Sequence, residues 1–105
     1  MLVGDMYAPG KIRLIDAPEP ELPPHPPEGC SGQILCQPET TCLCGSDLPY
    51  FTGSDEWPIE LGHSLHEMIG TVTATNGGRW RVGERVLAVP LKQMGLQERF
   101  VLDEN

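Results

Sequence analysis

Alternating polar and apolar residues along this chain predict short strands rather than long helices. Residues 11–16 largely alternate between polar and apolar side chains, which is typical of a half-buried strand. Residues 68–75 are rich in β-branched side chains and predict the clearest strand, which a turn at residues 76–78 ends. Further strands are expected over residues 32–41, 84–89 and 97–102. Because no helical period is sustained over several turns, we expect a mainly β fold with only short helical turns.

A proline-dense segment, residues 17–27, separates the first predicted strand from the second. Proline cannot donate a backbone hydrogen bond to a sheet, so we expect an extended connector on the surface. Several short strands joined by turns are typical of a small β-barrel. The 105 residues are enough for one domain, which we expect to span residues 1–105.

The charge of the chain limits the classes of partner. A formal net charge of −8 argues against binding to nucleic acid or to an anionic membrane surface. The first ten residues lack the basic flank and apolar run of a secretory signal, and no later segment has the length to span a bilayer. We therefore expect a cytoplasmic, reducing environment. In it the four cysteines are expected to be thiols or metal ligands rather than disulfides: Cys30, Cys36, Cys42 and Cys44.

Two short segments carry the chemistry that the residue types suggest. Cys44-Gly45-Ser46-Asp47 is followed further along the chain by His66-Glu67 and the predicted strand. A thiolate together with an imidazole favours zinc over magnesium or calcium, which prefer oxygen ligands. The candidate zinc ligands are Cys44, His66 and Glu67. Otherwise Cys44 is a small buried side chain, and Glu67 is the partner of a cation.

The order and spacing of these segments resemble the zinc-dependent alcohol dehydrogenases of the medium-chain dehydrogenase/reductase superfamily. The N-terminal half of those proteins carries a Cys-Gly-Ser-Asp type segment and then Gly-His-Glu, two apolar residues and Gly-x-Val. Residues 81–86 resemble the turn and strand that follow in the family, with Glu84 in place of its usual aspartate. The resemblance implies a GroES-like small β-barrel, the N-terminal catalytic domain of that superfamily.

Two histidines compete for the position of the family's ligand. An alignment on Gly62-His63 keeps the glycine but leaves Ser64 where glutamate is expected. An alignment on His66-Glu67 keeps the glutamate and the strand after it but puts Leu65 at the glycine. The second alignment keeps more residues, so we favour His66. His63 is the alternative ligand, or else lies near the substrate or on the surface.

The resemblance also implies roles for neighbouring residues. Ser46 matches the hydroxyl that relays the substrate proton, and Asp47 the carboxylate that orients a ligand imidazole. Asp47 can also cap a short helical turn. Cys42 is interpreted as a neighbour of the site that packs in the core rather than a ligand. Three side chains of the following loop are candidates for lining a substrate pocket: Leu48, Phe51 and Trp57.

Departures from the family pattern limit what the resemblance implies. Residues 90–95 contain no cysteine, so we expect one catalytic zinc and no structural zinc. The family's third protein ligand and its nucleotide-binding domain have no counterpart here, and no Gly-x-Gly-x-x-Gly follows a strand. NAD(P) is therefore expected only with a further domain, and this chain alone is not expected to be active.

Two functions remain open at this point. The first is the zinc-binding domain of a dehydrogenase acting on a small alcohol, aldehyde or polyol, with zinc polarising the substrate oxygen for hydride transfer to NAD(P). The alternative is a non-catalytic GroES-like binding or interaction module. The sequence leaves open whether the chain is a monomer or a homo-oligomer.

Overall fold

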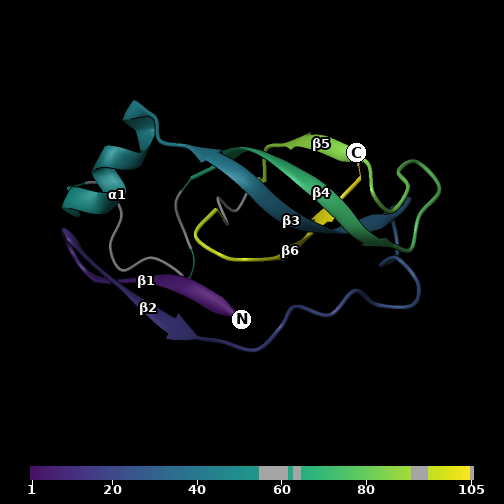
Figure 1. Ribbon diagram of the computed structural model, residues 1–105, viewed down its shortest axis with the longest axis horizontal. Helices are drawn as coiled ribbons and strands as arrows, with labels where there is room; N and C mark the ends of the chain where they lie inside the picture. The colour runs from purple at the N-terminus through teal and green to yellow at the C-terminus, as the bar shows by residue number, and fades with distance from the viewer. Residues whose placement is uncertain (55–61, 63–64, 91–94, 105) are drawn as a thin grey trace.

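The computed structural model of the protein describes residues 1–54, 62, 65–90 and 95–104. Strands dominate the described chain, which confirms the mainly β prediction, and the helical content is one short 3₁₀ turn, η1, and one short helix, α1. Figure 1 shows the arrangement of these elements. In chain order they are β1 (Leu2–Ala8), β2 (Lys11–Asp16), β3 (Gln33–Cys42), η1 (Gly45–Asp47), α1 (Leu48–Thr52), β4 (Glu67–Thr75), β5 (Arg85–Ala88) and β6 (Phe100–Asp103).

The main sheet has four antiparallel strands in the order β5-β4-β3-β6. Its centre is the pair β3–β4, in which Cys42 at the end of β3 lies opposite Glu67 at the start of β4. Pro38 lies inside β3, where the register with β4 shifts between Pro38 and Thr40. A bulge tolerates proline because the strand loses its regular hydrogen bonding there.

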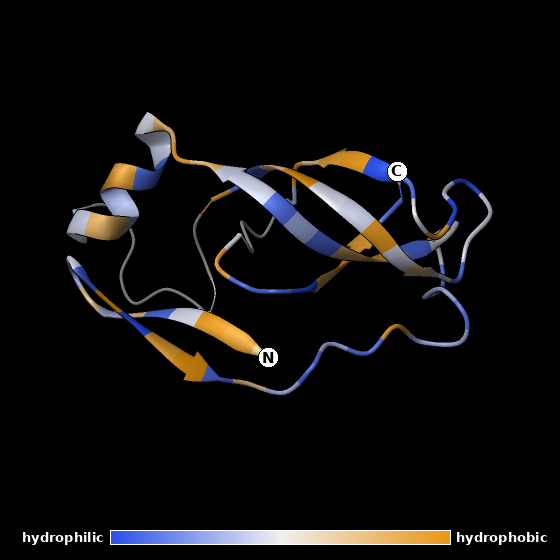
Figure 2. Cartoon of the chain, in the orientation of Figure 1, coloured by the Kyte–Doolittle hydropathy of each residue, from blue (hydrophilic) through white to orange (hydrophobic). Residues whose placement is uncertain are grey.

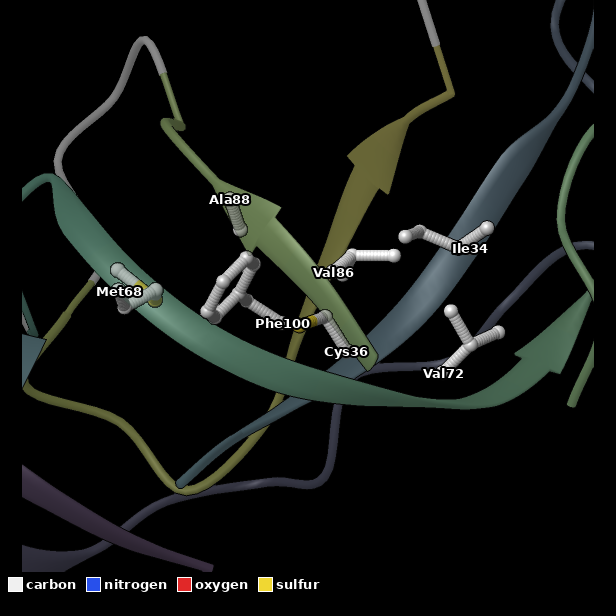
Figure 3. Close-up of a cluster of buried hydrophobic side chains, with 7 residues drawn as sticks. All are labelled: Ile34, Cys36, Met68, Val72, Val86, Ala88 and Phe100. Atoms are coloured by element: carbon white, nitrogen blue, oxygen red, sulfur yellow. The ribbon is translucent and has the colours of Figure 1, made fainter. Parts of the chain in front are cut away.

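Alternate side chains of these strands point inward and form the core, which Figure 3 shows in close-up. The period of two is clear in β4, where Met68, Gly70 and Val72 are buried. The buried cluster draws on all four strands: Ile34, Cys36, Met68, Val72, Val86, Ala88 and Phe100.

Cys36 belongs to this core and not to a metal site. Burial, with a smaller contribution from the Glu39 carboxylate, raises the pKa of its thiol from 9.0 to about 11. A thiol whose charged form is disfavoured by apolar surroundings is unreactive, as expected of a cysteine that packs in the core. A side chain on Gly70 would not fit beside it, since a Cβ there would lie 2.6 Å from Cys36 Sγ.

The hairpin β1–β2 forms a second sheet, and the chain ahead of β6 joins it to the first. Val3 bridges Gln97, and the Gly4 N–H donates to the Leu96 carbonyl at 2.7 Å. A glycine suits this close approach because an added Cβ at Gly4 would lie 3.1 Å from Leu96 Cβ. These contacts connect the hairpin to the segment that leads into β6, while the two sheets remain separate.

The structure also differs from the sequence-based expectations. β1 was not predicted, because Gly4 and Asp5 interrupt its pattern. The loop expected after Asp47 instead begins with helix α1, and residues 55–60 lie outside the described residues. Residues 17–27 form neither strand nor helix, as expected, and Asn76 Nδ2 donates to the Pro23 carbonyl at 2.9 Å. Over the described part of the chain, no helix is both long and apolar enough to cross a membrane.

Candidate metal centre

The pairing of β3 with β4 brings the two predicted metal-ligand segments to one end of the sheet. The strands are antiparallel, so the end of β3 and the start of β4 lie side by side. Cys44 follows that end of β3 and His66 directly precedes β4. Residues distant in sequence therefore meet because of the sheet register.

The first of the two segments, which contains Cys44, forms a tight local turn. Cys44 is the N-cap of η1, and its backbone N–H donates to Asp47 Oδ2 at 2.9 Å. The Asp47 carboxylate thus bonds the N-cap residue of η1, which lies three positions earlier in the chain. This arrangement is a capping box. It does not cap α1, since no side-chain bond of that kind is made at the start of α1.

Asp47 also reaches the second segment. Its side chain is almost fully buried, at 1% exposure, and its Oδ1 accepts a hydrogen bond from the Leu65 N–H at 3.0 Å. One carboxylate therefore ties the backbone of Cys44 to the backbone just before His66. Buried charges are tolerated when they are hydrogen-bonded, and these two amide donors meet that need.

The side chains of Cys44, Asp47 and His66 form one group that could hold a metal ion. A sulfur, a carboxylate oxygen and an imidazole nitrogen from these residues lie within 4.8 Å of one another. Nδ1 of His66 is buried and has no hydrogen-bond partner among the described residues. A buried nitrogen without a partner is costly unless something binds it. The mixed sulfur, nitrogen and oxygen donors fit zinc, so the residues present fit the metal that the resemblance implies.

Glu67 and Ser46 lie at the margin of this group. The Glu67 side chain is half exposed, and its Oε1 lies 3.8 Å from His66 Nε2. Ser46 is exposed, and its Oγ lies 2.8 Å from Cys44 Sγ. Cys42 is exposed at the end of β3, so the interpretation of Cys42 as a core residue is wrong. His63 and Trp57 lie outside the described residues.

Leu65 carries an unusual backbone conformation just before His66. Its φ is +62°, which makes it the only non-glycine residue with a positive φ in the described chain. This is the position at which the sequence comparison put Leu65 in place of a family glycine. Gly95 packs against it, and the Gly95 N–H donates to the Leu65 carbonyl at 3.0 Å. The left-handed backbone fits an alignment in which His66 takes the place of the family's histidine.

The left-handed backbone at Leu65 predicts an unusual order of stability for two variants. Both Leu65→Gly and Leu65→Ala lose the leucine contacts, but only alanine keeps a Cβ at positive φ. We therefore expect Leu65→Gly to be more stable than Leu65→Ala by about 1 kcal/mol in urea unfolding. At the exposed Val82, the same pair should show the usual order, with alanine the more stable. The alanine variant being the more stable at position 65 as well would contradict the left-handed conformation.

The sequence did not identify Asp47 as a member of the metal group itself. It predicted a carboxylate that orients the ligand imidazole, whereas the carboxylate bonds two backbone amides and lies among the candidate ligand atoms. The sequence signal for the bond to the Cys44 amide was the spacing of Cys44 and Asp47, which is the N-cap to N3 spacing of a capping box.

Comparison with known proteins agrees with the fold, and the region matched by the family model includes the segments that form the group. The model of the family described as the alcohol dehydrogenase GroES-like domain matches residues 30–100. An alcohol dehydrogenase of Cupriavidus necator is 33% identical over 85 residues, which is 76% of this chain and 20% of that protein. The chain thus spans about a fifth of the length of this curated relative.

Solved structures show the same fold at lower identity. The crystal structure of S. aureus TarJ superposes with a TM-score of 0.68 and 21% identity, over 98% of this chain and 29% of that one. The structure of S. aureus TarJ in complex with NADPH gives a TM-score of 0.69 at the same identity, over 98% of this chain and 31% of that one.

Proposed function

Because the chain belongs to the alcohol dehydrogenase GroES-like domain family, we propose that it is the zinc-binding part of an alcohol or polyol dehydrogenase. The observation that carries the proposal is the group formed by Cys44, Asp47 and His66, whose ligand atoms lie within 4.8 Å of one another. We further propose that residues 1–105 act as one GroES-like domain of such an enzyme.

In this proposal Cys44 and His66 hold the metal, with Asp47 or Glu67 supplying a carboxylate oxygen. When bound, zinc would supply a Lewis acid that polarises the oxygen of an alcohol or carbonyl substrate. Asp47 keeps the two ligand segments together through its bonds to the Cys44 and Leu65 amides. That restraint limits how far the ligands can move apart when the site is empty.

In this proposal Ser46 relays the proton of the substrate. Its hydroxyl is exposed on η1 and lies next to Cys44 Sγ. A hydroxyl beside the metal group can accept the proton of a bound alcohol while donating its own to solvent. Hydride transfer itself needs a nicotinamide, which we assign to a nucleotide-binding domain outside residues 1–105.

Cobalt(II) titration of the reduced protein tests the metal site directly. We expect a thiolate-to-cobalt charge-transfer band, which EDTA removes and magnesium does not produce, because Mg²⁺ prefers oxygen ligands. His66→Ala should weaken cobalt binding by at least about 100-fold, while His63→Ala should leave it near that of the parent protein.

Cobalt binding by the two histidine variants distinguishes the two alignments. The spectrum of the parent protein tests the zinc proposal itself. If His63→Ala were the damaging change, the ligand assignment would pass to His63. A parent protein without a charge-transfer band would contradict the zinc proposal and would favour the non-catalytic binding module.

A further inference from the structure

The connecting segment, residues 95–97, lies between the hairpin β1–β2 and the chain that precedes the histidine of the metal group. On the side of the hairpin, the Leu96 carbonyl accepts a hydrogen bond from the Gly4 N–H. On the other side, the Gly95 N–H donates to the Leu65 carbonyl at 3.0 Å. Backbone hydrogen bonds therefore link the hairpin, through this segment, to the residue just before that histidine.

The side chain of Leu96 packs toward the hairpin. It lines an apolar groove together with Met6 of β1, and Figure 2 shows hydrophobic residues in both strands of the hairpin. Leu48 and Phe51, the described candidates for a substrate pocket, line the same groove. Apolar packing of this kind is favourable, so it helps to hold the connecting segment against the hairpin.

Gly95 has no room for a side chain. An added Cβ would lie 2.5 Å from the Leu65 carbonyl oxygen and closer still to Leu65 Cβ. Gly95 is buried, and it is not among the glycines of the described chain that have a positive φ. Glycine is therefore required here by the closeness of Leu65 and not by the backbone conformation of Gly95 itself.

The backbone of Leu65 is held at both of its peptide groups. Its carbonyl accepts the hydrogen bond from Gly95, and its N–H donates to Asp47 Oδ1 at 3.0 Å. A left-handed conformation is unfavourable for leucine and persists only where the surroundings fix it. These two hydrogen bonds and the close packing of Gly95 supply that restraint.

The Leu65 carbonyl also sets the orientation of His66. A peptide group is planar, so the Leu65 carbonyl and the His66 N–H lie in one plane. Because β4 begins at the next residue, Glu67, His66 is held between this plane and the sheet. Nδ1 of His66 makes no hydrogen bond with the described residues, so the backbone is the main restraint on where the imidazole lies.

We propose that Gly95 is a positioning residue of the metal centre. Because it lacks a side chain, the connecting segment can hold Leu65 in its left-handed conformation, and that conformation directs His66 toward Cys44 and Asp47. The effect on metal binding rests on the proposed function. The dependence of the Leu65 backbone on Gly95 does not, and it is measurable in the metal-free protein.

A double-mutant cycle on positions 95 and 65, followed by cobalt(II) titration, tests the proposal. We expect Gly95→Ala to weaken cobalt binding by about 10- to 100-fold, as is usual when a group that orients a metal ligand is lost. In the Leu65→Gly protein the same change should weaken binding by less than about threefold, because glycine has no Cβ to meet the new methyl group and can shift its backbone. Gly78→Ala is the matched control, since an added Cβ there meets nothing within 4 Å, and it should leave cobalt binding unchanged.

Cobalt spectra and urea unfolding separate positioning from a loss of stability. Affinity is measured under conditions in which far-UV circular dichroism shows that each variant is folded. Displacement of His66 should change the visible ligand-field bands of cobalt, while the thiolate-to-cobalt band from Cys44 remains. A purely structural role would lower the urea midpoint and leave the ligand-field bands of the folded protein unchanged. If Gly95→Ala alone does not fold, the double variant must still fold and bind cobalt, since Leu65→Gly removes the conflict.

The spectrum of the parent protein distinguishes failure of this proposal from failure of the zinc proposal. In a parent protein with the thiolate-to-cobalt band, an unchanged affinity for Gly95→Ala, an equal loss in both backgrounds, or a double variant that does not fold would overturn the positioning role and leave the zinc proposal intact. In a parent protein without the band the zinc proposal fails, and urea midpoints in EDTA test the contact alone. Gly95→Ala should then lower the midpoint of the parent protein much more than that of Leu65→Gly, and an equal decrease in both would overturn the dependence of Leu65 on Gly95.

Discussion

Replacing Cys44 by serine is expected to abolish the thiolate-to-cobalt charge-transfer band and to weaken zinc binding by at least about 100-fold. The band arises from a sulfur ligand, and Cys44 contributes the sulfur in the group of candidate ligand atoms. A serine hydroxyl is similar in size, but it stays protonated at neutral pH and binds zinc poorly. The measurement is a cobalt(II) titration followed by competition with zinc.

Cys42→Ser is the matched control for this prediction. Cys42 is an exposed thiol two positions before Cys44, and it is not a member of the metal group. Its replacement should leave both the band and the zinc affinity unchanged. Should the band follow Cys42 instead of Cys44, the ligand assignment and the geometry of the group would both be wrong.

Replacing Asp47 by alanine is expected to lower the free energy of unfolding by about 3 kcal/mol. The carboxylate is buried and accepts hydrogen bonds from the backbone amides of Cys44 and Leu65. Its loss leaves two amides without their partners at the junction of two chain segments. Asp47→Asn should cost about half as much, because the amide oxygen can replace one acceptor and its NH₂ group cannot replace the other.

Urea unfolding in the presence of EDTA measures this effect without any contribution from bound metal. Asp16→Ala serves as the control, since the Asp16 side chain is 89% exposed and pairs with the N-terminus on the surface. Such surface pairs contribute only about 0 to 1 kcal/mol. If Asp47→Ala were no more destabilising than Asp16→Ala, Asp47 would not be the residue that joins the two segments.

The strand pattern was read from local sequence with good accuracy where one face of a strand is buried. β4, which has one buried face, begins one residue before the expected 68–75. β2 lies at residues 11–16 as predicted, but its side chains are mostly exposed, so the expectation of a buried face is wrong for this strand. Alternation reports burial on one face, so it works for strands of the main sheet. It did not detect β1, where Gly4 is buried by its approach to the distant Leu96.

Helix α1 illustrates a second limit of local sequence. It has five residues, with proline in its first turn, and it is followed by Gly53 in a left-handed conformation. Five residues are too few to establish a helical period, so the same residues are also compatible with a loop. Proline near the start and glycine after the end are helix signals, but they are also common in turns.

The sequence by itself determined the chemistry of the candidate site. Thiol and imidazole are properties of residue type, so Cys44 and His66 point to zinc wherever the chain places them. Only the tertiary structure decided how these residues meet and which carboxylate joins them. The meeting depends on the β3–β4 register, and the Asp47 bond to Leu65 spans 18 positions along the chain. A contact of that range forms through the pairing of whole strands, and no local pattern of residues encodes it.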